Sequence, residues 1–90
     1  MLFEWDINKE LRNIKLHHVD FKTASLVFQD ENRIEWYDAA HSLEEDRYNT
    51  IGMVNKILFV VYTERRDKIR LISARLATRE ERSLYYDGDI

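Results

Sequence analysis

The pattern of apolar and polar residues in the second half of the chain predicts two paired strands. Ile57–Tyr62 is an unbroken run of aliphatic and aromatic residues, which is typical of a strand buried on both faces. The polar stretch Glu64–Asp67 predicts a turn, and apolar and polar residues then alternate over Lys68–Arg75. Strict alternation assigns one face to Lys68, Arg70, Ile72 and Ala74, and the other to Ile69, Leu71, Ser73 and Arg75.

Helical periodicity dominates the first third of the chain. Asp6 is a good N-cap, and a first helix should run from there to an end near Leu16–His18. A second cap at Asp20 precedes the predicted helix Phe21–Phe28. The expected apolar stripes are Ile7, Leu11 and Ile14 in the first helix, and Phe21, Ala24, Val27 and Phe28 in the second. Since two short helices cannot bury their stripes alone, we expect both to pack on a sheet.

Three further segments complete the predicted sheet. Leu2–Trp5 indicates an edge strand or a lead-in, while Asn32–Tyr37 and Arg47–Val54 indicate strands. Gly52 suggests a bulge or a close backbone approach, and Asn55 suits a tight turn. The stretch 38–46 should be a polar loop, with one helical turn capped by Ser42.

A capping box, Thr78-Arg79-Glu80-Glu81, should begin a last helix. Short loops make the four strands after the helices an antiparallel meander. The predicted fold is therefore α+β, with two N-terminal helices on a mainly antiparallel sheet of four to five strands and a C-terminal helix. With 90 residues, we expect one domain spanning 1–90.

Composition narrows the class of protein. The chain contains no cysteine, which excludes disulfides and thiolate metal sites. No apolar run approaches the length of a membrane span, so we expect a cytoplasmic protein without membrane contact. The net charge of −3 hides an acidic segment, 29–49, and a basic segment, 62–82, which has seven bases against four acids. Such a basic cluster suits an anion or a nucleic acid, although a solvated surface of mixed charge fits equally well.

Arginines gather where the last strand meets the last helix. Arg75, Arg79 and Arg82 lie near a predicted helix N-terminus, where guanidinium groups and free N–H groups suit phosphate. Ion pairs to the acidic segment are a serious alternative for all three. His41 could exchange protons near neutral pH, but a lone histidine in a loop is more often an ordinary loop residue than a catalyst. The chain has no glycine-rich phosphate loop and no carboxylate pair at metal spacing, so metal-free RNA cleavage is the enzyme chemistry left open.

Several short blocks resemble the BrnT toxins in sequence order. They are Phe3-Glu4-Trp5-Asp6 with Lys9 and Asn13, His41-Ser42 with Arg47, Ile51-Gly52, Tyr62-Thr63-Glu64-Arg65, Ile69–Arg75 and Ala77–Tyr85. The resemblance covers nearly the whole chain. It implies a ribonuclease toxin of a type II toxin–antitoxin system with a RelE-like fold. It also implies a BrnA-type antitoxin, a heterotetrameric complex, an RNA substrate, and contact with operator DNA only through the antitoxin.

The resemblance also implies a set of site residues. Catalytic candidates are His41, Glu64, Arg65, Arg79 and Arg82, with His41 or Glu64 handling protons. Candidate contacts to RNA phosphate are Lys9, Arg70, Arg75 and Tyr85. No metal and no cofactor is expected.

Departures from the family pattern keep a second hypothesis open. Leu16, Leu76 and Glu80 stand where the family commonly has cations, and Arg66 stands where it has glycine. Because RNA binding depends on phosphate contacts, the chain could be a catalytically weakened binding protein that serves only as an antitoxin partner. A stand-alone transcription factor is disfavoured by the net acidity and by the lack of a recognition helix.

Overall fold

The computed structural model, which describes residues 1–88, is built on a five-stranded sheet with the strand order β1-β5-β4-β3-β2. The strands are β1 (Leu2–Trp5), β2 (Ile34–Tyr37), β3 (Tyr48–Val54), β4 (Lys56–Arg65) and β5 (Lys68–Leu76). β2 to β5 form the antiparallel meander, and β1 adds a parallel edge strand beside β5. The predicted fold class is confirmed.

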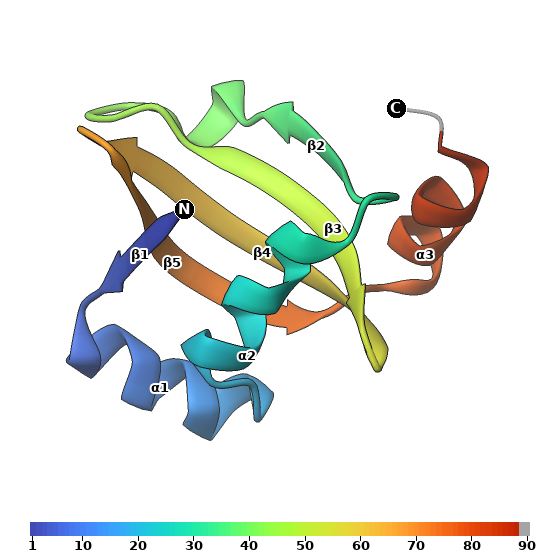
Figure 1. The fold of residues 1–90 in the computed structure, drawn as a ribbon, viewed down its shortest axis with the longest axis horizontal. Helices are drawn as coiled ribbons and strands as arrows, with labels where there is room; N and C mark the ends of the chain where they lie inside the picture. The colour runs from blue at the N-terminus through green and yellow to red at the C-terminus, as the bar shows by residue number, and fades with distance from the viewer. Residues whose placement is uncertain (89–90) are drawn as a thin grey trace.

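The helices divide between the two faces of this sheet. They are α1 (Ile7–His17), α2 (Phe21–Ser25), the 3-10 turns η1 (Leu26–Gln29) and η2 (Ala39–His41), and α3 (Arg79–Asp87). In Figure 1, α1 and α2 lie together while α3 stands apart from them beside β3. The predicted caps at Asp6, Asp20 and Thr78 are confirmed, since each side chain accepts a backbone N–H bond.

The main core lies under α2 and η1, on the face that we call the covered face. Phe21 and Ala24 of α2 and Val27 of η1 are fully buried there against the sheet, and Phe28 is partly buried beside them, which confirms the predicted stripe. The predicted helix Phe21–Phe28 is wrong in its second half, because the α-helix ends at Ser25 and the chain continues as the 3-10 turn η1. Gly52 of β3 allows this close packing, because a Cβ at this position would lie 2.6 Å from a methyl group of Val27. The close approach expected at Gly52 is therefore confirmed.

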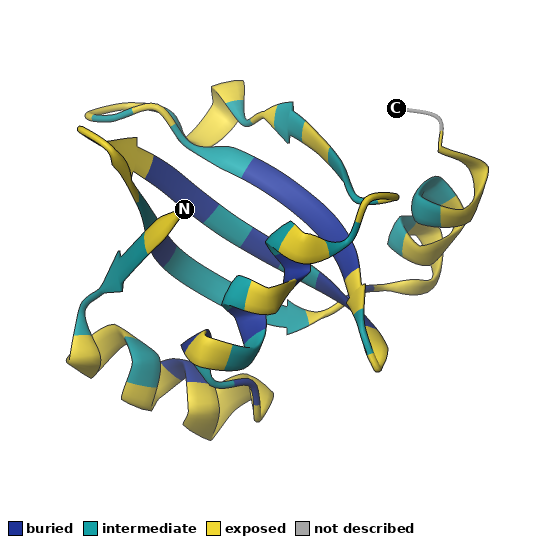
Figure 2. Cartoon of the chain, viewed as in Figure 1, coloured by how far each residue is buried: buried dark blue, intermediate teal, exposed yellow. Residues whose placement is uncertain are grey.

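The apolar stripe of α1 is not buried, contrary to the prediction. Ile7 and Leu11 are 59% and 58% exposed, and the buried residue of α1 is Asn13 (Figure 2). The Asn13 amide donates to the carbonyls of Val19 and Ala74 and accepts from the backbone N–H of Ala74. These bonds fix the rotation of α1, so its apolar side faces away from the sheet.

The face assignment of β5 is also wrong in part, because a β-bulge interrupts the strand. Val61 pairs with Ser73 but Tyr62 pairs with Leu71, which leaves Ile72 as an extra residue. Leu71 and Ala74 consequently point into the same core. Strict alternation had put them on opposite faces.

The turns follow the predicted chemistry with small shifts. Asn55 adopts a positive φ of 61° in the β3–β4 hairpin, as expected. The predicted four-residue turn at Glu64–Asp67 is shorter, since β4 continues to Arg65 and β5 resumes at Lys68. The helical turn of the 38–46 loop is η2, which precedes Ser42, so Ser42 does not cap its start.

Candidate functional site: a polar cavity on the open face

The face of the sheet opposite α1 and α2 carries a cavity of about 370 Å³, which we call the open-face cavity. Its floor comes from the central strands, and the 38–47 loop forms one side. The lining residues are Asp38, His41, Arg47, Asn49, Phe59, Val61, Ile72, Ser73 and Arg75. The cavity therefore combines an apolar floor with polar groups, which are the His41 imidazole, the Arg47 and Arg75 guanidinium groups, the Asn49 amide and the Ser73 hydroxyl.

His41 is held in place by a carboxylate. Its Nδ1 lies 2.9 Å from Asp38 Oδ2, and the His41 backbone N–H bonds the Asp38 carbonyl in the η2 turn. Because an ionised carboxylate can only accept, this contact puts the proton on Nδ1 and leaves Nε2 as the free acceptor. The two ends of the loop are bonded to each other, since Asp38 N–H donates to the Arg47 carbonyl and Ser42 Oγ accepts from Arg47 N–H.

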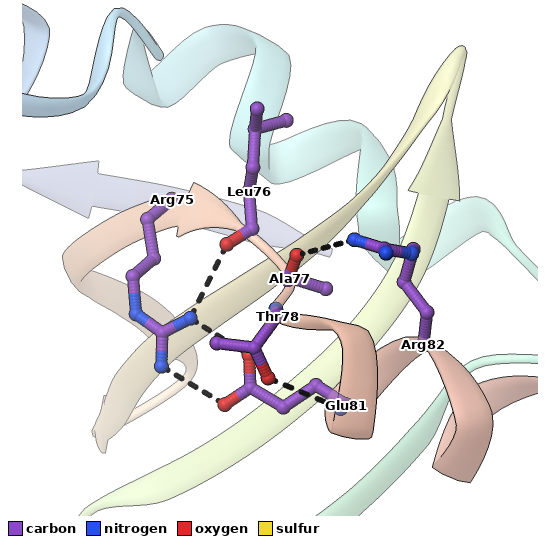
Figure 3. Close-up of polar contacts among 6 residues, drawn as sticks. All are labelled: Arg75, Leu76, Ala77, Thr78, Glu81 and Arg82. Carbon is purple, nitrogen blue, oxygen red and sulfur yellow. Dashed lines mark hydrogen bonds and ion pairs between the residues drawn. The ribbon is translucent and has the colours of Figure 1, made fainter.

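Arg75, at the end of β5, is paired with α3 rather than free. Its guanidinium donates two bonds to the Glu81 carboxylate, at 2.7 and 2.9 Å, and lies 4.3 Å from the Phe59 ring centroid (Figure 3). The bond to Glu81 raises the pKa of Arg75. Burial opposes ionisation of Glu81, but the bonds from Arg75 and from Thr78 N–H keep its pKa below the usual value. The predicted capping box thus also anchors α3 to the cavity wall.

Arg47 and Asn49 were not among the predicted site residues. Within residues 1–88 the Arg47 guanidinium forms no ion pair, but Asp38 lines the same cavity, and Glu44 and Glu45 line an adjoining hollow together with Arg47. Asn49 is 92% buried, and its Oδ1 has no hydrogen-bond partner within the described chain. The sequence contained a signal for this pair. Arg47 and Asn49 are two residues apart at the start of an apolar strand, so alternation puts their side chains on the same face.

The arginines of α3 lie outside the open-face cavity. Arg82 donates to the Ala77 carbonyl (Figure 3). It also lines a separate hollow of about 320 Å³ with Tyr86 and Met53. Arg79, the first residue of α3, is exposed. The two are therefore near the cavity wall formed by Arg75 and Glu81 but do not line the cavity itself.

Tyr85 has a structural contact. Its hydroxyl donates to Asp30 Oδ2 at 2.6 Å, and its ring packs beside Ile51 and Ile57. This hydrogen bond, with burial, raises the pKa of Tyr85 to about 12. The contact fixes α3 to the loop before β2, so the hydroxyl is already occupied.

The remaining predicted residues lie elsewhere. Arg65 pairs with Glu45 at 3.6 Å at the hairpin end of the sheet, where Glu64 is exposed, and Arg70 pairs with Glu4 at 2.9 Å. The position of Arg65 is six residues along β4 from Phe59, or about 20 Å away. Lys9 lies on α1, which covers the opposite face, so the structure does not bring it to the open-face cavity.

Comparison with known proteins decides the family. A family model described as the ribonuclease toxin BrnT of type II toxin–antitoxin systems matches residues 5–81. The chain belongs to the BrnT family. A crystal structure of the Brucella abortus ribonuclease toxin BrnT is similar to this BrnT-family chain, with a TM-score of 0.69 and 24% identity over 88% of this chain and 100% of that chain. At this identity the likeness supports the fold. No similar sequence was found among curated proteins.

Membership in the BrnT family gives the coarse function directly. The chain is a toxin of a type II toxin–antitoxin system, of a family named for ribonuclease activity, and such a toxin has an antitoxin partner. Among residues 1–88, no helix is long and apolar enough to cross a membrane. Within the same residues, no three histidine or carboxylate side chains cluster as metal ligands would.

Proposed function

We propose that this toxin is a metal-independent endoribonuclease whose reaction takes place in the open-face cavity. In such a reaction the ribose 2′-oxygen attacks the neighbouring phosphorus and the bond to the 5′-oxygen breaks. The products are a 2′,3′-cyclic phosphate and a 5′-hydroxyl. The reaction needs a base for the 2′-hydroxyl proton, cations for the phosphorane charge and an acid for the leaving oxygen.

The observation that carries the proposal is the His41–Asp38 pair at the cavity edge. A carboxylate that orients an imidazole leaves Nε2 directed to a substrate, which is the arrangement of a general base and its orienting group. His41 then takes the proton from the 2′-hydroxyl at Nε2. The protonated imidazole then returns the proton to the leaving oxygen, since Glu64 lies at the hairpin end of the sheet, outside the open-face cavity.

The cations of the open face would hold the phosphates. Arg47, which forms no ion pair within residues 1–88, suits the scissile phosphate, while Arg75 also lines the cavity although Glu81 pairs with it. Other predicted cations line the path of a longer strand. These are Arg79 and Arg82 beside the first turn of α3, and Arg65 and Arg70 toward the β4–β5 hairpin. Tyr85 supports this path indirectly by holding α3.

A second candidate function is a binding protein that no longer cleaves RNA. The ion pairs of Arg65 with Glu45 and of Arg75 with Glu81 favour it, because a paired guanidinium binds phosphate less strongly. In this case the chain would act only as the partner of its antitoxin. In either case we propose a BrnA-type antitoxin, a heterotetrameric complex, and repression of the operon through the DNA-binding antitoxin.

Cleavage of RNA by the purified chain in excess EDTA separates the two candidates. We expect cleavage to 2′,3′-cyclic phosphate ends, reduced about 100-fold or more in His41→Ala and Arg47→Ala. His17→Ala is the matched control, because His17 lies on the other side of the sheet, and it should cleave within about twofold of the wild type. Absence of cleavage by the wild-type chain, or wild-type rates in both cavity variants, would contradict the ribonuclease proposal.

A further inference from the structure

One exposed side of α1 is apolar although the helix packs on a sheet. Ile7, Leu11 and Ile14, which we call the α1 stripe, are 59%, 58% and 38% exposed. In Figure 2 most of α1 is coloured as exposed, whereas α2 turns its buried residues to the sheet. An amphipathic helix usually buries its apolar stripe, and an exposed one marks a surface that another molecule covers.

Polar anchors hold α1 in this orientation. Asn13 makes three hydrogen bonds, of 2.7 to 3.0 Å, to backbone groups of Val19 and Ala74. The carboxylate of Glu10 accepts from the Trp5 indole N–H and from a backbone N–H of α2. Rolling α1 to bury the stripe would break all of these buried bonds, so the fold itself keeps the stripe outside.

The exposed charges along one border of the α1 stripe are basic. Lys15 lies one helical turn after Leu11, and Arg12 lies beyond it on the same side, whereas the one acidic residue of α1, Glu10, is used internally. An apolar stripe with bases along one border complements a helix that is apolar on one side and acidic at its border. A second copy of this chain would bring the same bases together across a twofold axis, which disfavours self-association.

A hollow continues the surface at the end of α1. This cavity of about 480 Å³ is lined by His17 and His18, and its apolar walls include Val54, Leu58 and Leu76. Leu76 is itself half-exposed. The hollow can take a large apolar side chain from a segment that lies along α1.

We propose that the α1 stripe is the docking surface for an acidic amphipathic helix of the antitoxin. The proposal rests on the toxin–antitoxin pairing but not on RNA cleavage. The α1 stripe and the open-face cavity belong to opposite faces of the sheet. A helix docked on α1 therefore leaves the cavity uncovered, and neutralisation needs a further segment of the antitoxin that reaches the other face.

The test measures, by calorimetry, the affinity of the full chain for the purified BrnA-type antitoxin proposed as its partner. Leu11→Glu puts a negative charge at the centre of the α1 stripe and should weaken binding about 30-fold or more. Because Leu11 is exposed, the thermal unfolding of the variant should match the wild type. Leu26→Glu is the matched control, since Leu26 is a 42% exposed leucine outside α1, and its dissociation constant should stay within about twofold.

Charge reversal tests the acidic character of the partner. Arg12→Glu with Lys15→Glu should weaken binding about 10-fold at low salt and less at high salt. Wild-type affinity in Leu11→Glu would overturn the proposal, and so would a self-association of the wild type that Leu11→Glu abolishes. The two proposals can fail separately. If the wild-type chain cleaves no RNA while Leu11→Glu weakens antitoxin binding, the ribonuclease proposal is contradicted and the docking surface is supported.

Discussion

The two faces of the sheet differ in what they bury. On the covered face, Phe21, Val27, Val60 and Leu71 form a core with almost no exposed surface. On the open face, apolar packing is confined to a smaller cluster around Ile51 beside α3, and a polar cavity occupies the rest. The comparison indicates that stability resides on one face and chemistry on the other, so substitutions on each face should have separable effects.

The largest effect is expected from Phe21→Ala on the covered face. Phe21 is fully buried and its ring packs edge-on against Trp5 at 6.1 Å. Truncation leaves a cavity that the rigid sheet cannot fill, so the free energy of unfolding should fall by about 3–5 kcal/mol. Chemical denaturation measures this loss. A loss below about 1 kcal/mol would show that the covered face does not carry the stability.

Asn13→Ala should lower the free energy of unfolding by about 2–3 kcal/mol, less than Phe21→Ala does. The substitution leaves backbone groups of Val19 and Ala74 buried without the bonds that Asn13 supplies. Amide hydrogen exchange should report the loss at Ala74 N–H. Asn8→Ala, an exposed asparagine on the same helix, is the control and should change stability by less than about 0.5 kcal/mol. Equal effects of the two substitutions would contradict the anchoring role of Asn13.

Glu81→Gln should lower the free energy of unfolding by about 1–2 kcal/mol near neutral pH, because it breaks the bidentate bond to Arg75. The pKa of Glu81 is lowered in the folded state. Its contribution is therefore present above the unfolded pKa and is lost as the pH falls through the folded pKa. The melting temperatures of the variant and the wild type should therefore approach each other as the pH falls through the lowered folded pKa of Glu81. A difference in melting temperature that stays constant throughout the acid range would contradict the ion-pair explanation.

Asn49→Leu in the open-face cavity should have the smallest effect on stability but a clear effect on RNA cleavage. The substitution removes a buried oxygen that has no partner within residues 1–88, so stability should stay equal or rise by about 1 kcal/mol. RNA cleavage should fall about 10-fold or more, because a polar wall of the cavity is lost. A parallel loss of stability and activity would show that the two faces are not separable.

Much of the fold was predictable because local chemistry decides it. The caps at Asp6, Asp20 and Thr78, the apolar run of β4 and the turn at Asn55 each follow from neighbouring residues. The site was less predictable. His41 and Arg75 were predicted and do line one cavity, but Arg47 and Asn49 were missed, and Lys9 lies on the other face. Which polar residues share a cavity depends on contacts between segments distant in the sequence.

By itself the sequence determined which segments form helices and strands and where the three α-helices begin, since N-caps and apolar periodicity act within a few residues. Only the tertiary structure decided the rotation of α1, because the bonds of Asn13 to β5 outweigh the apolar stripe that periodicity alone would bury. It also decided the register of β5, where one extra residue at Ile72 brings Leu71 and Ala74 to the same face. Both results arise from pairing across long sequence separations, which local patterns do not encode.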